Sequence, residues 1–232
     1  MIELFTAPTP NGWKISIMLE ECALPFDVRW VNIGKGDQFK PEFLAISPNN
    51  RIPAIVDNDP AGGGEPIAIF ETGAILLYLA EKSGRFLPTD PRGRKAVHEW
   101  LFWQVGGLGP MLGQHGHFKL YAPERIPYPT ERYHKETLRL YGVLDRQLEK
   151  HPYVAGDTYT IADMACFPWV QTYRAQEIDL AEFPNVDRWY KRLKSRAALR
   201  RGMELGRKQI NRRPQDSAET RKLLFGIEDK PA

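Results

Sequence analysis

The stretch NNRIPAIVDNDPAGGGEPIAIFETGAI, residues 49–75, contains the pattern that decides the fold of this 232-residue chain. Two short apolar runs, Pro53–Val56 and Pro66–Phe70, flank a connection rich in proline and glycine, an arrangement typical of a β-hairpin. An apolar stripe with helical spacing begins at Thr72 and ends near Gly84, which predicts a helix. The stretch therefore predicts two strands followed directly by a helix.

The residues before this stretch supply the rest of a small sheet. Residues 2–6 and 26–32 are rich in β-branched and aromatic side chains, which predicts two strands. Between them, apolar residues recur with the spacing of a helix: Ile15, Met18, Leu19 and Cys22. Residues 33–47 are expected to form a loop and a short helix. The order strand, helix, strand, then hairpin and helix predicts a mixed sheet with helices on its faces.

The second half of the chain shows helical periodicity and no convincing strand. Apolar residues recur with helical spacing over 94–105, 133–148 and 186–193. Thr160 and Asp163 have the spacing of a capping box at a helix N-terminus. We therefore predict an α/β domain over 1–84, a linker over 85–92, an all-α domain over 93–206 and a basic, loosely ordered tail over 207–232.

The charge of the chain does not indicate a nucleic-acid partner. The formal net charge is +3, but residues 1–84 carry −5, residues 85–206 carry +5 and the tail carries +3. A nucleic-acid-binding protein would concentrate its basic residues on one face. The N-terminus lacks the basic and apolar regions of a signal peptide, and no apolar stretch approaches the length of a membrane span. We expect a cytoplasmic protein with neither nucleic-acid nor membrane partners.

Three junctions in the first domain carry side chains that could bind an anionic peptide. Thr9 and Asn11 precede the first helix, where free backbone N–H groups and the helix dipole stabilise an anion or a thiolate. Ile52 precedes Pro53, and a cis peptide bond there would turn its backbone outward to pair with an extended peptide. Glu71 and Thr72 could hold the ammonium and carboxylate groups of an amino acid. Ordinary helix capping explains the polar residues at both helix starts equally well when each is considered alone.

The ordered set of motifs resembles the cytosolic glutathione S-transferases. The set consists of the Thr9–Asn11 turn, then Asn49-Asn50-Arg51-Ile52-Pro53-Ala54, then Glu71-Thr72-Gly73-Ala74-Ile75, followed by an all-helical half. The resemblance covers roughly residues 1–205. Residues 34–39 and 102–111 are more particularly similar to the bacterial Nu-class branch and the fungal prion-related branch.

The resemblance implies a fold, a co-substrate and residue roles. It implies a thioredoxin-like domain, a cis bond before Pro53, and a homodimer that binds glutathione or glutathione disulfide. By position, Glu71 and Thr72 would hold the γ-glutamyl head, and Ile52 would pair with the cysteinyl backbone. Arg51 and Gln38 would reach the glycyl end, and Thr9 and Asn11 would flank the sulfur. Arg132 would contact a second glutathione.

The chemistry expected of this set is reduction of a small disulfide, with a peroxide as a further substrate, by the thiolate of bound glutathione. The chain offers Thr9-Pro10-Asn11 where many family members have Tyr, Ser or Cys, so either Thr9 or Asn11 could dominate thiolate stabilisation. Two alternatives stay open. The same thiolate could conjugate glutathione to an electrophile, or the chain could be a non-catalytic binding module.

Other conspicuous residues are not assigned to the site. His98, His115 and His117 lack the spacing and companions of a metal site, so no metal is expected. The glycines over 106–109 follow no strand and indicate close helix packing or a kink before Pro110. Cys22 and Cys166 are expected to be buried and inert. Four tryptophans with helical spacing are expected to lie in the core: Trp100, Trp103, Trp169 and Trp189.

Overall fold

The hairpin forms where the sequence predicts it. Strands β3 (Ala54–Asp57) and β4 (Ile67–Phe70) pair antiparallel, and helix α3 (Thr72–Ser83) follows directly. The structure is a computed structural model that describes residues 1–207 and 218–226. The remaining elements are β1 (Ile2–Thr6), α1 (Pro10–Cys22), β2 (Phe26–Trp30), η1 (Ile33–Lys35), η2 (Asp37–Phe39), α2 (Pro41–Leu44), α4 (Pro91–Trp103), η3 (Gln104–Leu108), α5 (Gly109–Gly116), η4 (His117–Tyr121), α6 (Pro127–Lys150), α7 (Ile161–Val170), η5 (Leu180–Glu182), α8 (Pro184–Lys194), α9 (Ala197–Glu204) and α10 (Ala218–Phe225).

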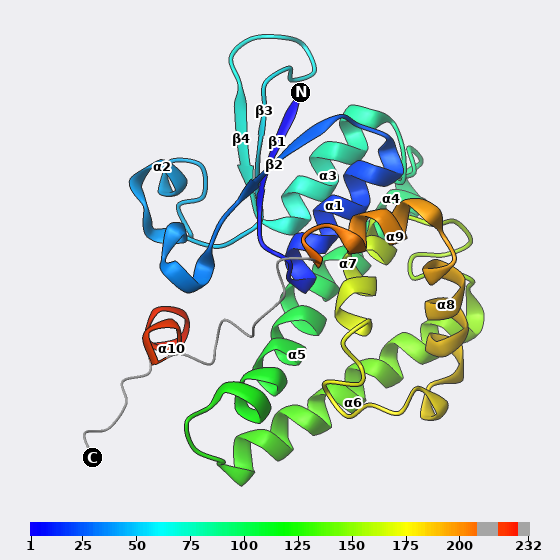
Figure 1. The fold of residues 1–232 in the computed structure, drawn as a ribbon. Coiled ribbons are helices and arrows are strands. Elements are labelled where there is room, and N and C mark those ends of the chain that lie inside the picture. Colours follow the sequence, from blue (N-terminus) through cyan, green and yellow to red (C-terminus); the bar gives the residue numbers. More distant parts are fainter. Residues whose placement is uncertain (208–217, 227–232) are drawn as a thin grey trace.

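The sheet has the order β2-β1-β3-β4, in which β1 and β2 are parallel and the other pairs are antiparallel. Helices α1 and α3 cover the face that looks toward the helical half, and α2 lies on the other side of the sheet (Figure 1). A small cluster on that second side joins Val31, Phe43 and Ala54. The predicted thioredoxin-like arrangement followed by an all-helical half is confirmed.

Helix α1 ties the sheet to the helical half. Its neighbours include α7 and α9 as well as α3, and one continuous apolar core runs through both halves. A Cβ on Gly202 of α9 would lie 2.6 Å from Cα of Ile17, so glycine permits the close approach of α9 to α1. Near the end of α1, the buried Glu21 carboxylate accepts two hydrogen bonds of 2.7 Å from the Arg196 guanidinium. Such a bidentate pair fixes the relative orientation of the two helices.

The capping box at the start of α7 is confirmed. The Thr160 hydroxyl accepts a hydrogen bond from the backbone N–H of Ala162, and the Asp163 carboxylate accepts one from the backbone N–H of Thr160. Asp163 also accepts hydrogen bonds from the backbone N–H of Val154 and from Trp189 Nε1, at 2.9 and 2.8 Å. Burial raises the pKa of Asp163 to about 6, and these hydrogen bonds oppose that rise.

The glycines over 106–109 do not all serve close helix packing, which was one of the two expectations for them. Gln104–Leu108 forms a π-helical turn between α4 and α5, and a Cβ on Gly106 or Gly107 would meet nothing within 4 Å. Neither glycine therefore serves close packing. Gly109 does, because a Cβ there would lie 2.8 Å from Nε2 of Gln104.

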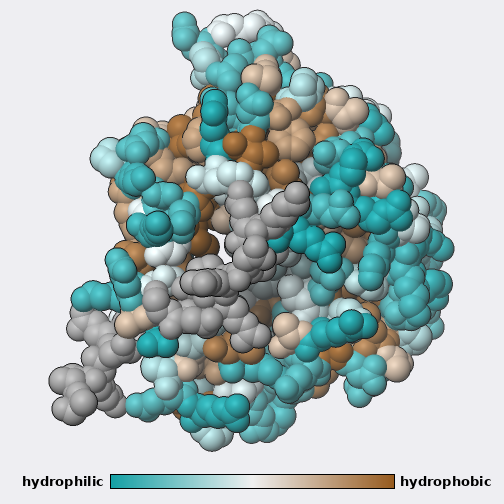
Figure 2. All heavy atoms as spheres, viewed as in Figure 1, coloured by the Kyte–Doolittle hydropathy of each residue, from teal (hydrophilic) through white to brown (hydrophobic). Residues whose placement is uncertain are grey.

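Part of the predicted tail forms helix α10, which contains the apolar cluster 223–225. The hydroxyl of Thr220 donates a hydrogen bond of 3.2 Å to the carbonyl of Gly34 in η1. The rest of the predicted tail, residues 208–217 and 227–232, lies outside the described residues. On the face in Figure 2, apolar residues are exposed in separate patches among hydrophilic ones. Within the described ranges, no helix is both long and apolar enough to cross a membrane.

Candidate functional site

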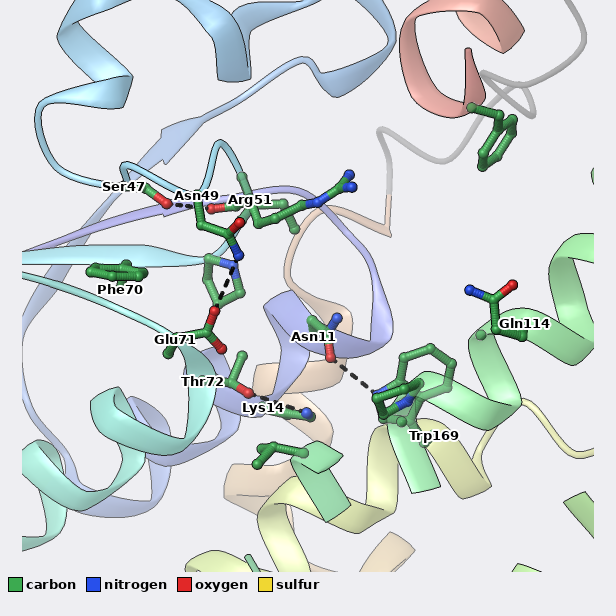
Figure 3. Close-up of a pocket in the computed structure, with 17 residues that line it drawn as sticks. Asn11, Lys14, Ser47, Asn49, Arg51, Phe70, Glu71, Thr72, Gln114 and Trp169 are labelled. Atoms are coloured by element: carbon green, nitrogen blue, oxygen red, sulfur yellow. Dashed lines mark hydrogen bonds between the residues drawn. The ribbon is translucent and has the colours of Figure 1, made fainter. Parts of the chain in front are cut away.

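The candidate site is a cleft of about 550 Å³ between the sheet and the helical half, a volume within the range of small-molecule sites, about 300–1,000 Å³. The starts of α1 and α3 and the loop before β3 form one wall, and η3, α5, α7 and α10 form the other (Figure 3). Six of the nine predicted site residues line it: Asn11, Arg51, Ile52, Pro53, Glu71 and Thr72.

The start of α3 presents an acid and a hydroxyl to the cleft. Glu71 adopts a φ of 69°, a backbone conformation uncommon for residues other than glycine, and its carbonyl accepts the first hydrogen bond of the helix, from Ile75. The Glu71 carboxylate is exposed and accepts a hydrogen bond of 3.3 Å from Nδ2 of Asn49. Thr72 is the first helical residue, so the unpaired backbone N–H groups of α3 lie beside an anionic side chain. This pairing suits a zwitterionic amino-acid head.

The start of α1 presents an amide to the cleft. The Thr9 hydroxyl accepts a hydrogen bond from the Gly12 N–H at 3.1 Å and caps the helix. Asn11 Oδ1 accepts a hydrogen bond of 3.1 Å from Trp169 Nε1. Because an indole N–H can only donate, this contact assigns the amide oxygen to the tryptophan side. The amide Nδ2 is therefore left as a donor for the cleft (Figure 3).

The loop before β3 presents its backbone. The Ser47 hydroxyl donates a hydrogen bond of 2.8 Å to the Arg51 carbonyl, which closes the loop on itself. The peptide bond between Ile52 and Pro53 is cis, as expected. No backbone hydrogen bond joins Ile52 to another residue in the described part of the chain. Its N–H and C=O can therefore pair with an extended ligand.

Lys14 lies at the floor of the cleft and was missed by the sequence analysis. It is 2% exposed, and its Nζ donates hydrogen bonds to Thr72 Oγ1 at 3.2 Å and to Gln104 Oε1 at 2.7 Å. Burial lowers its pKa to about 7. One signal was available in the sequence, because Lys14 precedes Met18 by four residues and thus falls on the apolar stripe of α1.

Two aromatic residues of the cleft were also missed. Trp169 was expected in the core, but it is only partly buried and lines the cleft. Phe225 of α10 closes another side, where its ring stacks on Tyr121 with centroids 5.4 Å apart and meets His117 edge-on at 4.8 Å. Helix α10 therefore spans from η1 of the sheet domain to η4 of the helical half.

Three predicted site residues do not line the cleft in this single chain. Thr9 is the cap residue of α1, and its hydroxyl accepts the hydrogen bond from the Gly12 N–H. Gln38 is buried in η2, where its Nε2 donates to the Ile33 carbonyl at 3.2 Å and its Oε1 has no partner among the described residues. Arg132 is exposed on α6.

Neither cysteine belongs to the cleft. Cys166 is fully buried, and burial raises the pKa of its thiol well above the usual range. Cys22 is half-buried rather than buried as expected, with its Sγ 3.3 Å from Ser83 Oγ, and burial raises its pKa as well. Among residues 1–207 and 218–226, no three His, Cys, Asp or Glu side chains gather in a way that could hold a metal ion.

Comparison with known proteins identifies the family. Residues 9–82 match the glutathione S-transferase N-terminal domain, and residues 129–197 match the glutathione S-transferase C-terminal domain. The chain belongs to the glutathione S-transferase family. The resemblance seen in the motifs is thereby confirmed, and the cleft lies where the matched N-terminal domain meets the helical half of this transferase.

Several relatives of this transferase are characterised by name or structure. The chain is 56% identical over 217 residues to the disulfide-bond oxidoreductase YfcG of Escherichia coli, covering 94% of this chain and 100% of the relative. It is similar to a Pseudomonas fluorescens glutathione transferase solved with two glutathiones bound (46% identity, TM-score 0.84, 88% of this chain and 92% of the other). A third relative, from Pseudomonas putida, was solved with one glutathione disulfide per subunit (43% identity, TM-score 0.83, 88% and 91% covered).

Proposed function

We propose that this protein is a glutathione-dependent disulfide reductase in which the reacting thiols belong to bound glutathione. The observation that carries the proposal is a cleft with an amide donor from Asn11 and with neither cysteine in its lining. Glutathione thiolate attacks one sulfur of the substrate disulfide and expels the other as a thiolate, which takes up a proton. A second glutathione then attacks the mixed disulfide, so that one disulfide and two glutathiones yield two thiols and glutathione disulfide.

The residues of the cleft suit each part of glutathione. The γ-glutamyl carboxylate is placed at Thr72 and the N–H groups of α3, and its ammonium at the exposed Glu71 carboxylate. The cysteinyl backbone pairs with the free N–H and C=O of Ile52, which directs the sulfur toward the start of α1. Arg51, at the mouth of the cleft, is placed at the glycyl carboxylate.

Gln38 and Arg132 keep the roles suggested by the resemblance, at the glycyl end and at a second glutathione. Gln38 has an unpartnered Oε1 in the described part of the chain, an acceptor that suits the glycyl N–H rather than the glycyl carboxylate. Arg132 is exposed and offers an always-charged guanidinium to a carboxylate. Both assignments are tested by single alanine variants, each of which should weaken binding of glutathione disulfide measured by calorimetry.

Activation of the sulfur requires a modest electrostatic effect. A free thiol has a pKa near 8.5, and lowering it to about 7 requires about 2 kcal/mol, because one pKa unit is about 1.36 kcal/mol. Hydrogen bonds to charged groups contribute about 1.5–3 kcal/mol each. The Asn11 amide, the Thr9 hydroxyl and the dipole of α1 are together sufficient for this shift.

The relatives support this chemistry. YfcG is named for disulfide-bond oxidoreduction, and the two Pseudomonas proteins accommodate two glutathiones or one glutathione disulfide. Two glutathiones are the thiols consumed over one catalytic cycle, and glutathione disulfide is the product of its resolving step. Peroxide reduction consumes the same two thiols and is proposed as a secondary activity.

The deciding experiment compares turnover of a small alkyl disulfide with conjugation of a chlorinated nitroarene, using glutathione as co-substrate for both. We expect reduction to exceed conjugation, and the reverse ranking would favour the conjugating alternative. The matched control is the double variant C22A/C166A. It should keep its reductase activity, because the thiols are those of glutathione. Calorimetry with glutathione and with its disulfide tests the other alternative, a non-catalytic binding module. Absence of binding of both ligands would favour that module.

The assembly and location expected for this function are a homodimer in the cytoplasm. Strand β4 is an edge of the sheet, and its Ile67 and Phe70 are exposed, as is Phe102 on α4. We propose that a partner subunit covers these side chains, since an interface would remove their apolar surface from water. Light scattering after size exclusion should give the mass of a dimer, and F102D should shift it toward a monomer. The cytoplasm keeps thiols reduced, which the co-substrate requires.

A further inference from the structure

Lys14 is a cation buried without a carboxylate partner. Its two hydrogen bonds go to neutral oxygens, those of Thr72 and Gln104, and within the described ranges it forms no ion pair. A buried charge normally has a counter-charge, because transferring an ion out of water without one is costly. Lys14 nonetheless lines the cleft. The missing counter-charge can therefore be supplied by a ligand.

The contact with Lys14 fixes the direction of the Thr72 hydroxyl. An ammonium group only donates hydrogen bonds, so Thr72 Oγ1 accepts from Nζ and its own hydrogen must point elsewhere. Thr72 lines the cleft at the start of α3. The hydroxyl hydrogen and the first backbone N–H groups of α3 are thus available to the same anionic group. In Figure 3, Lys14 lies between Thr72 and Asn11 at the base of the cleft.

We propose that Lys14 is the buried counter-charge of the ligand's γ-glutamyl carboxylate, and that its ammonium group orients the Thr72 hydroxyl toward that carboxylate. The proposal rests on the position of glutathione given under the proposed function. Lys14 acts through Thr72 and is a positioning residue rather than a catalytic one.

The groups around Lys14 make its charge sensitive to a bound anion. Glu71 on the α3 side is exposed and favours the ammonium, and Cys166 on the α7 side also favours it but is held as a neutral thiol by burial. From η3 only the neutral Gln104 faces Nζ. On the α9 side, Arg196 and Arg201 are paired with carboxylates of α1: Glu21 and Glu20.

The proton balance follows from these surroundings. Burial is the largest influence and lowers the pKa of Lys14 to about 7, so an empty cleft near neutral pH contains both the ammonium and the amine. A bound carboxylate favours the ammonium and raises this pKa. Between about pH 7 and the higher pKa of the complex, binding should therefore protonate Lys14. Below pH 6 Lys14 is already an ammonium in the free protein, so binding should take up few protons.

The test is calorimetric titration of the full-length protein with S-methylglutathione, in buffers that differ in ionisation enthalpy, from pH 6 to pH 9. This probe has the peptide but no thiol, so it removes proton release by the sulfur. The wild type should take up a fraction of a proton near pH 7.5 and much less at pH 6. K14M should bind at least about tenfold more weakly and lose most of this uptake, because the carboxylate loses its counter-charge and the Thr72 hydroxyl loses the donor that directs its hydrogen toward the ligand. The matched control K95M alters an exposed lysine paired with Glu99 and should change neither quantity.

The outcomes separate this inference from the proposed function. The amino group of the ligand can also take up a proton on binding, because it faces the Glu71 carboxylate. The difference in proton uptake between the wild type and K14M therefore measures the contribution of Lys14. Equal proton uptake by both proteins, or wild-type binding without uptake, would overturn the role of Lys14 and leave disulfide reduction standing. A wild type that binds neither S-methylglutathione nor glutathione would overturn both. If K14M does not fold, the pH series of the wild type and of K14Q decides by the same criteria.

Discussion

The contact between Trp169 and Asn11 leads to a prediction about the thiol of bound glutathione. If Asn11 Nδ2 donates to the sulfur, N11A should raise the thiol pKa in the complex. The geometry assigns one amide donor to the sulfur, and hydrogen bonds to charged groups are worth about 1.5–3 kcal/mol. At about 1.36 kcal/mol per pKa unit, the expected rise is about 1–2 units. Because the proposed lowering in the complex is about 1.5 units, from near 8.5 to about 7, this rise should return the thiol pKa to near its value in free glutathione.

The assay is a pH titration of the ultraviolet absorbance of the thiolate, as a difference spectrum between the complex and its separate components. W169F is the matched variant, because it keeps a ring at that position and removes only the N–H that holds Asn11 Oδ1. The amide can then turn, so we expect a rise smaller than that of N11A. An unchanged thiol pKa in N11A, together with unchanged reductase activity, would refute the reasoning and assign the sulfur to Thr9 and the helix dipole.

Three further predictions concern other parts of the molecule. In steady-state assays, T9A should weaken disulfide reduction without abolishing it, since Asn11 still donates a hydrogen bond to the sulfur. A loss of activity as large as that from replacing the whole turn would contradict this prediction. D163A should lower the free energy of unfolding by about 3–9 kcal/mol, because three buried N–H donors lose their acceptor at about 1–3 kcal/mol each. The surface variant D187A should change it by less than about 1 kcal/mol, and urea titration measures both. F225A should speed dissociation of glutathione several-fold in stopped-flow measurements, and an unchanged rate would show that the ring does not cover the ligand.

The elements of the first domain could be predicted because local chemistry specifies them. The hairpin over 54–70 and the start of α3 follow from turn residues and apolar runs that lie within a few positions of one another. The capping box at Thr160 is likewise a pattern of three-residue spacing. For the glycines over 106–109 the sequence indicated only close packing or a kink, because a π-helical turn has no such local signal.

The site was only partly predictable, because its remaining members meet across the chain. Lys14 is 90 residues from its partner Gln104, and Trp169 is 158 residues from Asn11. Phe225 reaches the cleft from a segment that reads as a polar tail. Periodicity in the sequence indicates only whether such a residue is buried or exposed. The packing of α1 against α7 and η3 places Lys14 and Trp169 in the same cleft.

Helix α1 also determines how the cleft can open. Its first turn contains Asn11, and Lys14 follows one turn later. Near its C-terminal end, Glu21 binds Arg196, and Ile17 lies in close contact with Gly202. A hinge between the two halves would have to separate these contacts, so the site is preorganised and binding spends little free energy on domain closure. The small helix α10 adds Phe225 to the cleft lining from outside this scaffold. We therefore expect glutathione to exchange for glutathione disulfide without separation of the two halves.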